Sequence, residues 1–275
     1  MPQSMRPKVT LVAESAGNGF TRPFRRRLNR RAVVSVASQF TPHTGETPET
    51  HFPLQTVNRL SQPRFINRYD SKEILVVVDG SCLNNGNTSY SDVPSSGGCS
   101  FIYKGGGTRG PATSYPFLQD GTEVGGTIGF PLEHCGPGGE LHDPTSNRAK
   151  LRAVIAALEF RPWHVEGWHR IVIATNLKYV VDGAVSFMPL WVRRRWRSAR
   201  GGRRMVANRD LWEELHGAIE NLRKHGTEVS FWLITRKDPA KNSEVVQDAR
   251  NAAQEAAWQY DEAAIEFTRL CGIHL

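Results

Sequence analysis

Two short apolar runs constrain the fold of this chain more than any other feature. Residues 74–78 end at Asp79-Gly80, and residues 171–175 end at Asn176. Apolar runs of this length, closed by turn residues, are typical of strands buried on both faces. Such strands need helices above and below them, so the runs favour a sheet that carries helices on its faces.

Between and after these runs the apolar residues take a helical period. In residues 145–160, Leu151, Val154, Ile155 and Leu158 form one stripe, and Thr145 or Ser146 is a suitable N-cap. Further helices are predicted at 177–187, 210–225 and 243–260, and further strands at 97–104 and 228–234. Residues 105–142, rich in glycine and proline, are expected to be mostly surface loop, with a strand near 113–118.

This order predicts an α/β domain with a mixed sheet over residues 72–260. Residues 1–71 show no sustained period and are rich in polar residues and proline, so a disordered N-terminal extension is expected. Residues 261–275 are assigned to a C-terminal extension. A chain of 275 residues is long enough for one large domain or two small ones.

The positive charge is concentrated at the N-terminus. Residues 1–44 hold eight basic residues and one acid, a net charge of +7 out of +8 for the whole chain. Residues 22–37 fit a patch for nucleic acid or nuclear import, an organelle transit peptide, or a solvated tail without a role. The sequence leaves these three interpretations open.

Cysteine usage and hydropathy set the expected compartment. The four cysteines, Cys82, Cys99, Cys135 and Cys271, include no C-x-x-C pair, so reduced thiols in an intracellular protein are expected. No run approaches the roughly 18 apolar residues of a membrane span. We expect a soluble monomer in the nucleus or cytoplasm, with the mitochondrion as an alternative.

Five segments, in order, carry a specific resemblance to a known family. They are residues 78–86, 145–153, 173–180, 191–212 and 242–253. The fourth contains Trp191, Trp196, Gly201, Asn208, Asp210, Leu211 and Trp212. Together the segments resemble the ribonuclease H type 1 family, in particular its fungal members. The resemblance implies the ribonuclease H-like fold, a five-stranded mixed sheet flanked by helices.

The resemblance also implies a chemistry, and this chain departs from it. Family members hydrolyse the RNA strand of an RNA/DNA hybrid, with four carboxylates that hold two Mg²⁺ ions. Of the four matching positions, Asp79 is retained. The other three are Lys150, Asn176 and Val246. The formal charge of the set therefore changes from −4 to about 0.

These replacements predict a salt bridge in place of a metal site. Lys150 should pair with Asp79; the alternative is that Lys150 turns to solvent. Glu244 and Asp248 are each two residues from Val246 and so point away from it on a helix. Glu140 and Asp143, in the loop before the helix, are the candidates for replacement ligands. No metal is expected, or Asp79 alone if any is bound.

The binding residues that the resemblance implies are better kept. Cys82, Asn84, Asn85 and Asn147 match positions that contact the minor groove and the RNA 2′-hydroxyls. Thr145, Trp196 and Asn208 match the pocket for a DNA-strand phosphate. Seven arginines match a basic protrusion that lies across the duplex: Arg193, Arg194, Arg195, Arg197, Arg200, Arg203 and Arg204. The alternative is a solvated arginine face, with Trp191 and Trp196 packed in the core.

The leading hypothesis is therefore a catalytically inactive ribonuclease H-like protein that binds RNA/DNA hybrid or double-stranded RNA and needs no cofactor. One alternative is an active hybrid ribonuclease with rearranged ligands and Mg²⁺. The other alternative is a protein-interaction scaffold on the same fold.

Overall fold

The computed structural model describes residues 37–57, 60, 63–84, 95–105, 126–198, 204–259 and 266–270. Several predicted features lie outside these residues, among them the basic tail up to residue 36, the strand near 113–118 and the positions of Asn85, Arg200 and Arg203. The cysteines within the described residues, Cys82, Cys99 and Cys135, form no disulfide with one another.

The centre of the fold is a six-stranded mixed sheet in the order β1-β8-β7-β4-β5-β6. Its strands are β1 (Ser38–Gln39), β4 (Glu73–Leu83), β5 (Ser96–Ile102), β6 (Thr127–Pro131), β7 (Arg170–Thr175) and β8 (Glu228–Leu233). β1, β8, β7 and β4 pair in parallel, whereas β5 pairs antiparallel with β4 and β6 pairs antiparallel with β5. The sheet has one strand more than the five predicted: β1 and β6 were not predicted, and the strand expected near 113–118 lies outside the described residues.

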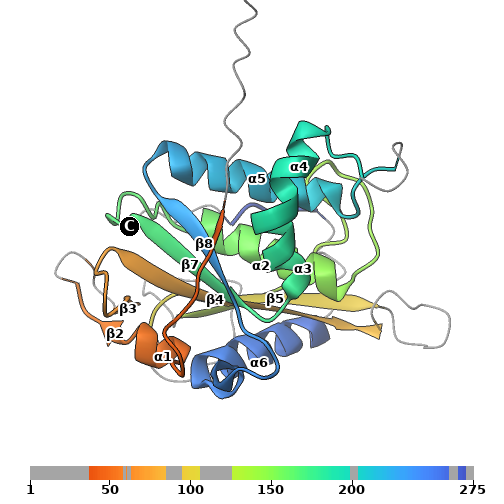
Figure 1. The fold of residues 1–275 in the computed structure, drawn as a ribbon. Helices are drawn as coiled ribbons and strands as arrows, with labels where there is room; N and C mark the ends of the chain where they lie inside the picture. The colour runs from red at the N-terminus through yellow and green to blue at the C-terminus, as the bar shows by residue number, and fades with distance from the viewer. Residues whose placement is uncertain are drawn as a thin grey trace, which may run out of the picture. The chain divides into compact units, whose positions relative to one another are not determined.

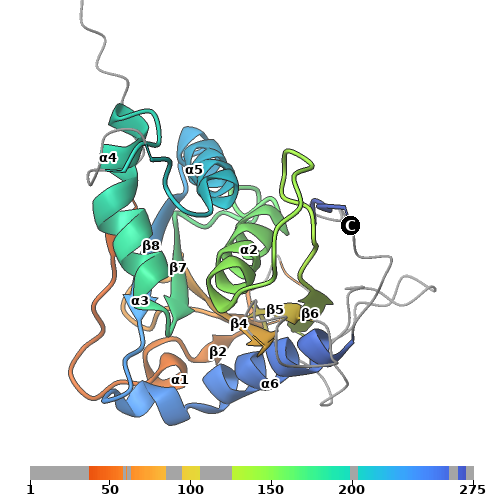
Figure 2. The ribbon, with the colours of Figure 1, turned by 90° about the vertical axis from the view of Figure 1, so that its right-hand side faces the viewer.

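Helices cover both faces of the sheet (Figure 1). Figure 2 shows α2 (Ser146–Glu159) and α5 (Arg209–Lys224) on one side of the sheet and α6 (Glu244–Trp258) on the other. The helix predicted at 177–187 is composite: α3 (Lys178–Asp182) continues through a π-helical segment (Gly183–Phe187) into α4 (Met188–Arg193). A short 3-10 turn (Pro239–Asn242) precedes α6.

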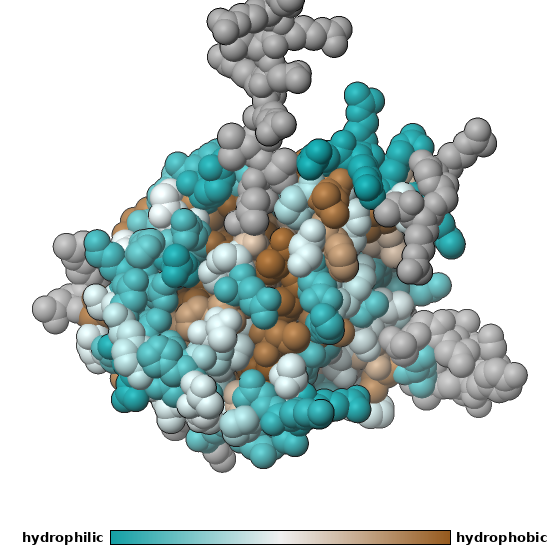
Figure 3. All heavy atoms as spheres, in the orientation of Figure 1, coloured by the Kyte–Doolittle hydropathy of each residue, from teal (hydrophilic) through white to brown (hydrophobic). Residues whose placement is uncertain are grey.

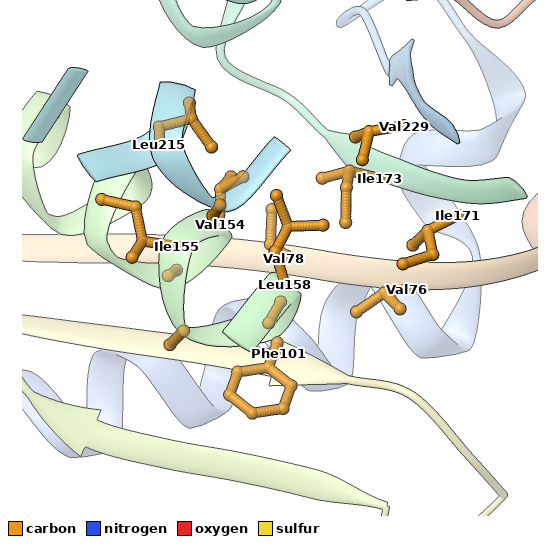
Figure 4. Packing of buried hydrophobic residues seen from close by; sticks show 14 of the residues in the cluster. Val76, Val78, Phe101, Val154, Ile155, Leu158, Ile171, Ile173, Leu215 and Val229 are labelled. Carbon is orange, nitrogen blue, oxygen red and sulfur yellow. The ribbon is translucent and has the colours of Figure 1, made fainter. Parts of the chain in front are cut away.

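Alternate residues of β4 face opposite layers of the core. Val76 and Val78 pack with Ile171 and Ile173 of β7 against α2, where Val154 and Leu158 meet them (Figure 4). Leu75 and Val77 face the layer of α6 and contact the cluster that contains Val246 and Ala249. Because each fully buried aliphatic side chain contributes roughly 1.5–3 kcal/mol, these two layers fix β4 from both sides.

The segment before residue 72 is the clearest correction to the prediction. Residues 38–66 form β1, α1 (Pro48–His51), β2 (Leu54–Gln55) and β3 (Arg64–Phe65). Phe52 and Phe65 are buried in the cluster beneath α6, and the Phe40 amide donates to the Phe231 carbonyl at 2.8 Å. A few aromatic anchors thus order a segment whose composition favours disorder, so the predicted boundary at residue 71 is wrong for the described part of this segment.

The described part of the C-terminal extension also contacts the domain. The Arg269 guanidinium lies 2.7 Å from Glu159 of α2 and 2.6 Å from Glu214 of α5. The Thr268 amide donates to Glu133 at 3.3 Å. Within the described ranges, no helix combines the length and the apolar character needed to cross a membrane.

Candidate functional site

Asp79 lies at the end of the apolar run of β4 and is almost fully buried. Its Oδ1 accepts hydrogen bonds from the Lys150 ammonium and, at 2.7 Å, from the Gly80 amide. Its Oδ2 accepts from the Asn176 side-chain amide at 3.2 Å, and Lys150 also donates to the Asn176 Oδ1 at 2.6 Å. Asp79, Lys150 and Asn176 therefore form a closed ring of hydrogen bonds, which confirms the predicted Lys150–Asp79 salt bridge.

Local backbone packing places Lys150 over Asp79. A Cβ atom on Gly80 would lie 2.6 Å from both the Ala149 carbonyl carbon and the Lys150 amide nitrogen. Glycine therefore allows β4 and α2 to touch here. The helix begins at the predicted N-cap Thr145, whose hydroxyl accepts from the Arg148 amide at 3.2 Å.

Val246 does not line the pocket around Asp79; it is buried in the apolar cluster between α6 and the sheet. The α6 residues that do line it are Arg250 and Gln254, one and two turns further along. The Arg250 Nε atom lies 4.0 Å from the Asp79 Oδ2. Sequence reasoning missed this second cation, although the i, i+4 spacing from Val246 places it on the same helical face.

We call this hollow the Asp79 pocket. It has a volume of about 160 Å³ and is lined by Asp79, Gly80, Ser81, Lys150, Asn176, Arg250 and Gln254. With two cations and one carboxylate, its formal charge is +1. In the part of the chain that the structure describes, there is no group of three or more His, Cys, Asp or Glu side chains that could hold a metal ion.

Part of the predicted groove-binding set lies together at the start of α2. The Cys82 thiol donates to the Pro144 carbonyl at 3.3 Å, so the end of β4 lies against the residue that precedes Thr145. Asn84 is exposed in a left-handed backbone conformation, with φ 58°. Asn147 is exposed on the first turn of α2. The structure thus presents two exposed amides on neighbouring elements.

An ion pair links the first turns of α2 and α5. Arg148 donates to the two Asp210 oxygens at 3.0 and 2.6 Å. Burial raises the pKa of Asp210, but the hydrogen bonds and charge of Arg148, together with the charge of His142 and the Leu211 amide, hold this pKa below its usual value. The pair lies within the first turns of the two helices whose N-caps, Thr145 and Asn208, are residues of the predicted phosphate pocket.

The third predicted member of the phosphate pocket lies in the core. Trp196 is only 9% exposed, and its ring packs 6.5 Å from that of Trp191 and 6.1 Å, edge-on, from that of His216. The alternative of core packing is therefore the one observed, and the Trp196 ring is not an open stacking surface. Arg195 and Trp196 both have left-handed backbones, with φ 54° and 61°, which turn the chain back towards the core.

The residues around this turn form an exposed cationic surface, which we call the basic protrusion. It comprises Arg193, Arg194, Arg195, Arg197 and Arg204, all exposed; Arg200 and Arg203 lie outside the described residues. In Figure 3, hydrophilic side chains project in the region that α4 occupies in Figure 1, beside apolar ones. Phe187, Leu190 and Met205 are exposed apolar residues of this region.

Both a family model and curated relatives match this chain to ribonuclease H proteins. Residues 125–254 match the family model described as RNase H. The chain is 38% identical over 109 residues to Ribonuclease H of Xanthomonas oryzae pv. oryzae, a match that spans 40% of this chain and just under two thirds, 66%, of that protein. It is 37% identical over 116 residues to Ribonuclease H of Xanthomonas campestris pv. campestris, which spans 42% of this chain and 70% of that protein.

The solution structure of the PFV RNase H domain aligns with 67% of this chain and 93% of its own length, with a TM-score of 0.44 and 13% sequence identity.

Proposed function

Because the chain belongs to the ribonuclease H family, we propose that it binds an RNA/DNA hybrid or double-stranded RNA without cutting it. The observation that carries this proposal is the Lys150 ammonium, which is hydrogen-bonded to Asp79 and Asn176. The resemblance places metal ions where that ammonium lies.

The donors of the Asp79 pocket do not fit Mg²⁺. This ion prefers an octahedron of oxygens and one or two carboxylates. Here the single carboxylate already accepts from Lys150, and the Asn176 carbonyl oxygen accepts from the same ammonium. At an effective dielectric constant of 20, a divalent ion about 4 Å from an ammonium is repelled by about 8 kcal/mol. Arg250, 4.0 Å from Asp79, adds to this repulsion.

The surface around the pocket supports binding. Asn84, directly after β4, and Asn147, on the first turn of α2, have exposed side chains, and amides of this kind can hydrogen-bond to 2′-hydroxyls and base edges. The basic protrusion supplies guanidinium groups, which pair with phosphates. Phosphate contacts of this kind give affinity and orientation, whereas 2′-hydroxyl contacts distinguish RNA from DNA.

Binding and cleavage assays on the full chain test the proposal. Fluorescence anisotropy with labelled RNA/DNA hybrid, double-stranded RNA and double-stranded DNA should show salt-sensitive binding that is weakest for DNA. The same hybrid, incubated with Mg²⁺ or Mn²⁺, should remain intact. Cleavage that disappears in Asp79→Asn would refute the proposed inactivity, and absence of binding at low salt would refute the binding role.

A further inference from the structure

The Asp79 pocket receives one cation from each layer of helices. Lys150 comes from α2 and Arg250 from α6, and these helices lie on opposite faces of the sheet (Figure 2). Both side chains reach the same carboxylate, Lys150 at Oδ1 and Arg250 at Oδ2. Asp79 of β4 is thus flanked by two positive groups, one at each carboxylate oxygen.

Both cations retain hydrogen-bond donors that the described residues do not use. An ammonium has three N–H groups, and Lys150 directs two of them to Asp79 and Asn176. A guanidinium has five, and among the described residues the only polar contact of Arg250 is the 4.0 Å approach to Asp79. The Arg250 side chain is 45% exposed, so a ligand can reach it from solvent.

The pocket offers donors suited to an anion. Besides the two cations, Ser81 and Gln254 line it with neutral donors. Its one acid, Asp79, is itself already paired with Lys150. A phosphate diester carries one negative charge and accepts charge-assisted hydrogen bonds, which are shorter and stronger than neutral ones.

We propose that the Asp79 pocket binds a backbone phosphate of the nucleic acid through Lys150 and Arg250, so that side-chain cations contact the strand where the resemblance places divalent ions. The inference rests on the proposed binding of nucleic acid and adds a site to it. Asp79 acts as a positioning residue that holds Lys150 at the pocket. Binding should therefore be independent of divalent metal.

Arg250→Gln is the variant that tests the site. Because the Arg250 side chain is exposed, its replacement leaves the buried Lys150–Asp79 pair in place. Its control is Lys224→Gln, which removes an exposed cation near the start of β8, at the opposite end of the sheet. Anisotropy titrations with labelled RNA/DNA hybrid are run in EDTA at several salt concentrations. A melting curve for each variant confirms that it folds.

We expect wild type to bind equally well in EDTA and in Mg²⁺ at matched ionic strength. Arg250→Gln should weaken binding about tenfold and lower the slope of log K against log salt by about one, whereas Lys224→Gln should change neither. If wild type binds but Arg250→Gln matches Lys224→Gln, the pocket does not contact phosphate and only this inference fails. If wild type binds no hybrid at all, the proposed function fails with it.

Discussion

The Asp79 pocket and the basic protrusion differ in how their charges are balanced. In the pocket the Asp79 carboxylate is buried and accepts hydrogen bonds from Lys150, Asn176 and Gly80. In the protrusion Arg193, Arg194, Arg195 and Arg197 are exposed, and none has an ion-pair partner among the described residues.

This difference follows from desolvation. A buried carboxylate must be matched by a cation and hydrogen-bond donors, because several kcal/mol are lost when it is left unpaired. Exposed arginines are solvated and can remain uncompensated until a ligand supplies the negative charge. Substitution of the buried partners should therefore change mainly the free energy of unfolding. Substitution of the protrusion arginines should change mainly the affinity for nucleic acid.

The largest effect should come from removing the cation of the buried pair. Lys150→Met leaves Asp79, whose side chain is 7% exposed, without its ammonium partner, and we expect a loss of about 3–5 kcal/mol in the free energy of unfolding. Urea unfolding measures it. The double variant Asp79→Asn/Lys150→Met should recover most of the loss. A single variant within about 0.5 kcal/mol of wild type would show that the pair is not structural.

Gly80→Ala should have the next largest effect on stability. The new methyl group would press on the backbone of Ala149 and Lys150 and push α2 away from β4. Overpacking of this kind costs about 1–3 kcal/mol, measured by urea unfolding. The control is Gly217→Ala on the exposed face of α5, where nothing lies within 4 Å and a gain of about 0.5–1 kcal/mol is expected. Equal behaviour of the two variants would contradict the close approach of β4 and α2.

Neutralising the protrusion should change affinity and not stability. The triple variant Arg193→Gln/Arg194→Gln/Arg195→Gln removes three charges, and we expect the salt slope of hybrid binding to fall by about 2–3. Its melting temperature should match that of wild type. The charge-matched control replaces Lys72, Arg223 and Lys224, exposed residues at the other end of the sheet, by Gln. If both triple variants lose the same affinity for the hybrid, the loss reflects net charge, and the protrusion is not a specific binding surface.

The smallest effect concerns pH and the Arg148–Asp210 pair. The pKa of Asp210 is lowered in the folded state, so the pair stabilises the fold above the usual pKa of an aspartate and this contribution is lost as the pH falls through the lowered value. Urea unfolding between pH 6 and pH 3 should show Asp210→Asn less stable than wild type at pH 6. The difference should shrink towards pH 3, and a constant difference would contradict the assignment.

The sequence predicted the elements whose signals are local. The strands β4, β5, β7 and β8 and the helices α2, α5 and α6 all lie where the apolar period places them. The strands β1 and β6 were not predicted, because β1 is two residues long and β6 lies in a glycine- and proline-rich region. Their pairing depends on partners that are distant in the sequence, such as Ser230 for Ser38.

The site was predictable where the motifs fix it. The Lys150–Asp79 pair followed from the resemblance and from charge alone, and the structure confirms it. Arg250 was missed because no motif singles it out; only the helical frame of α6 brings it to the pocket. The burial of Trp196 could not be predicted from the residues next to it in the sequence, because the left-handed backbone of Arg195 and Trp196 turns the ring towards the core.

A titration of Mn²⁺ into the purified protein, followed by isothermal calorimetry, tests the central claim most directly. With a pocket of formal charge +1, we expect no saturable heat up to millimolar Mn²⁺ and no difference between wild type and Asp79→Asn. Saturable binding of two ions per chain that Asp79→Asn abolishes would contradict the claim that Lys150 occupies the metal position.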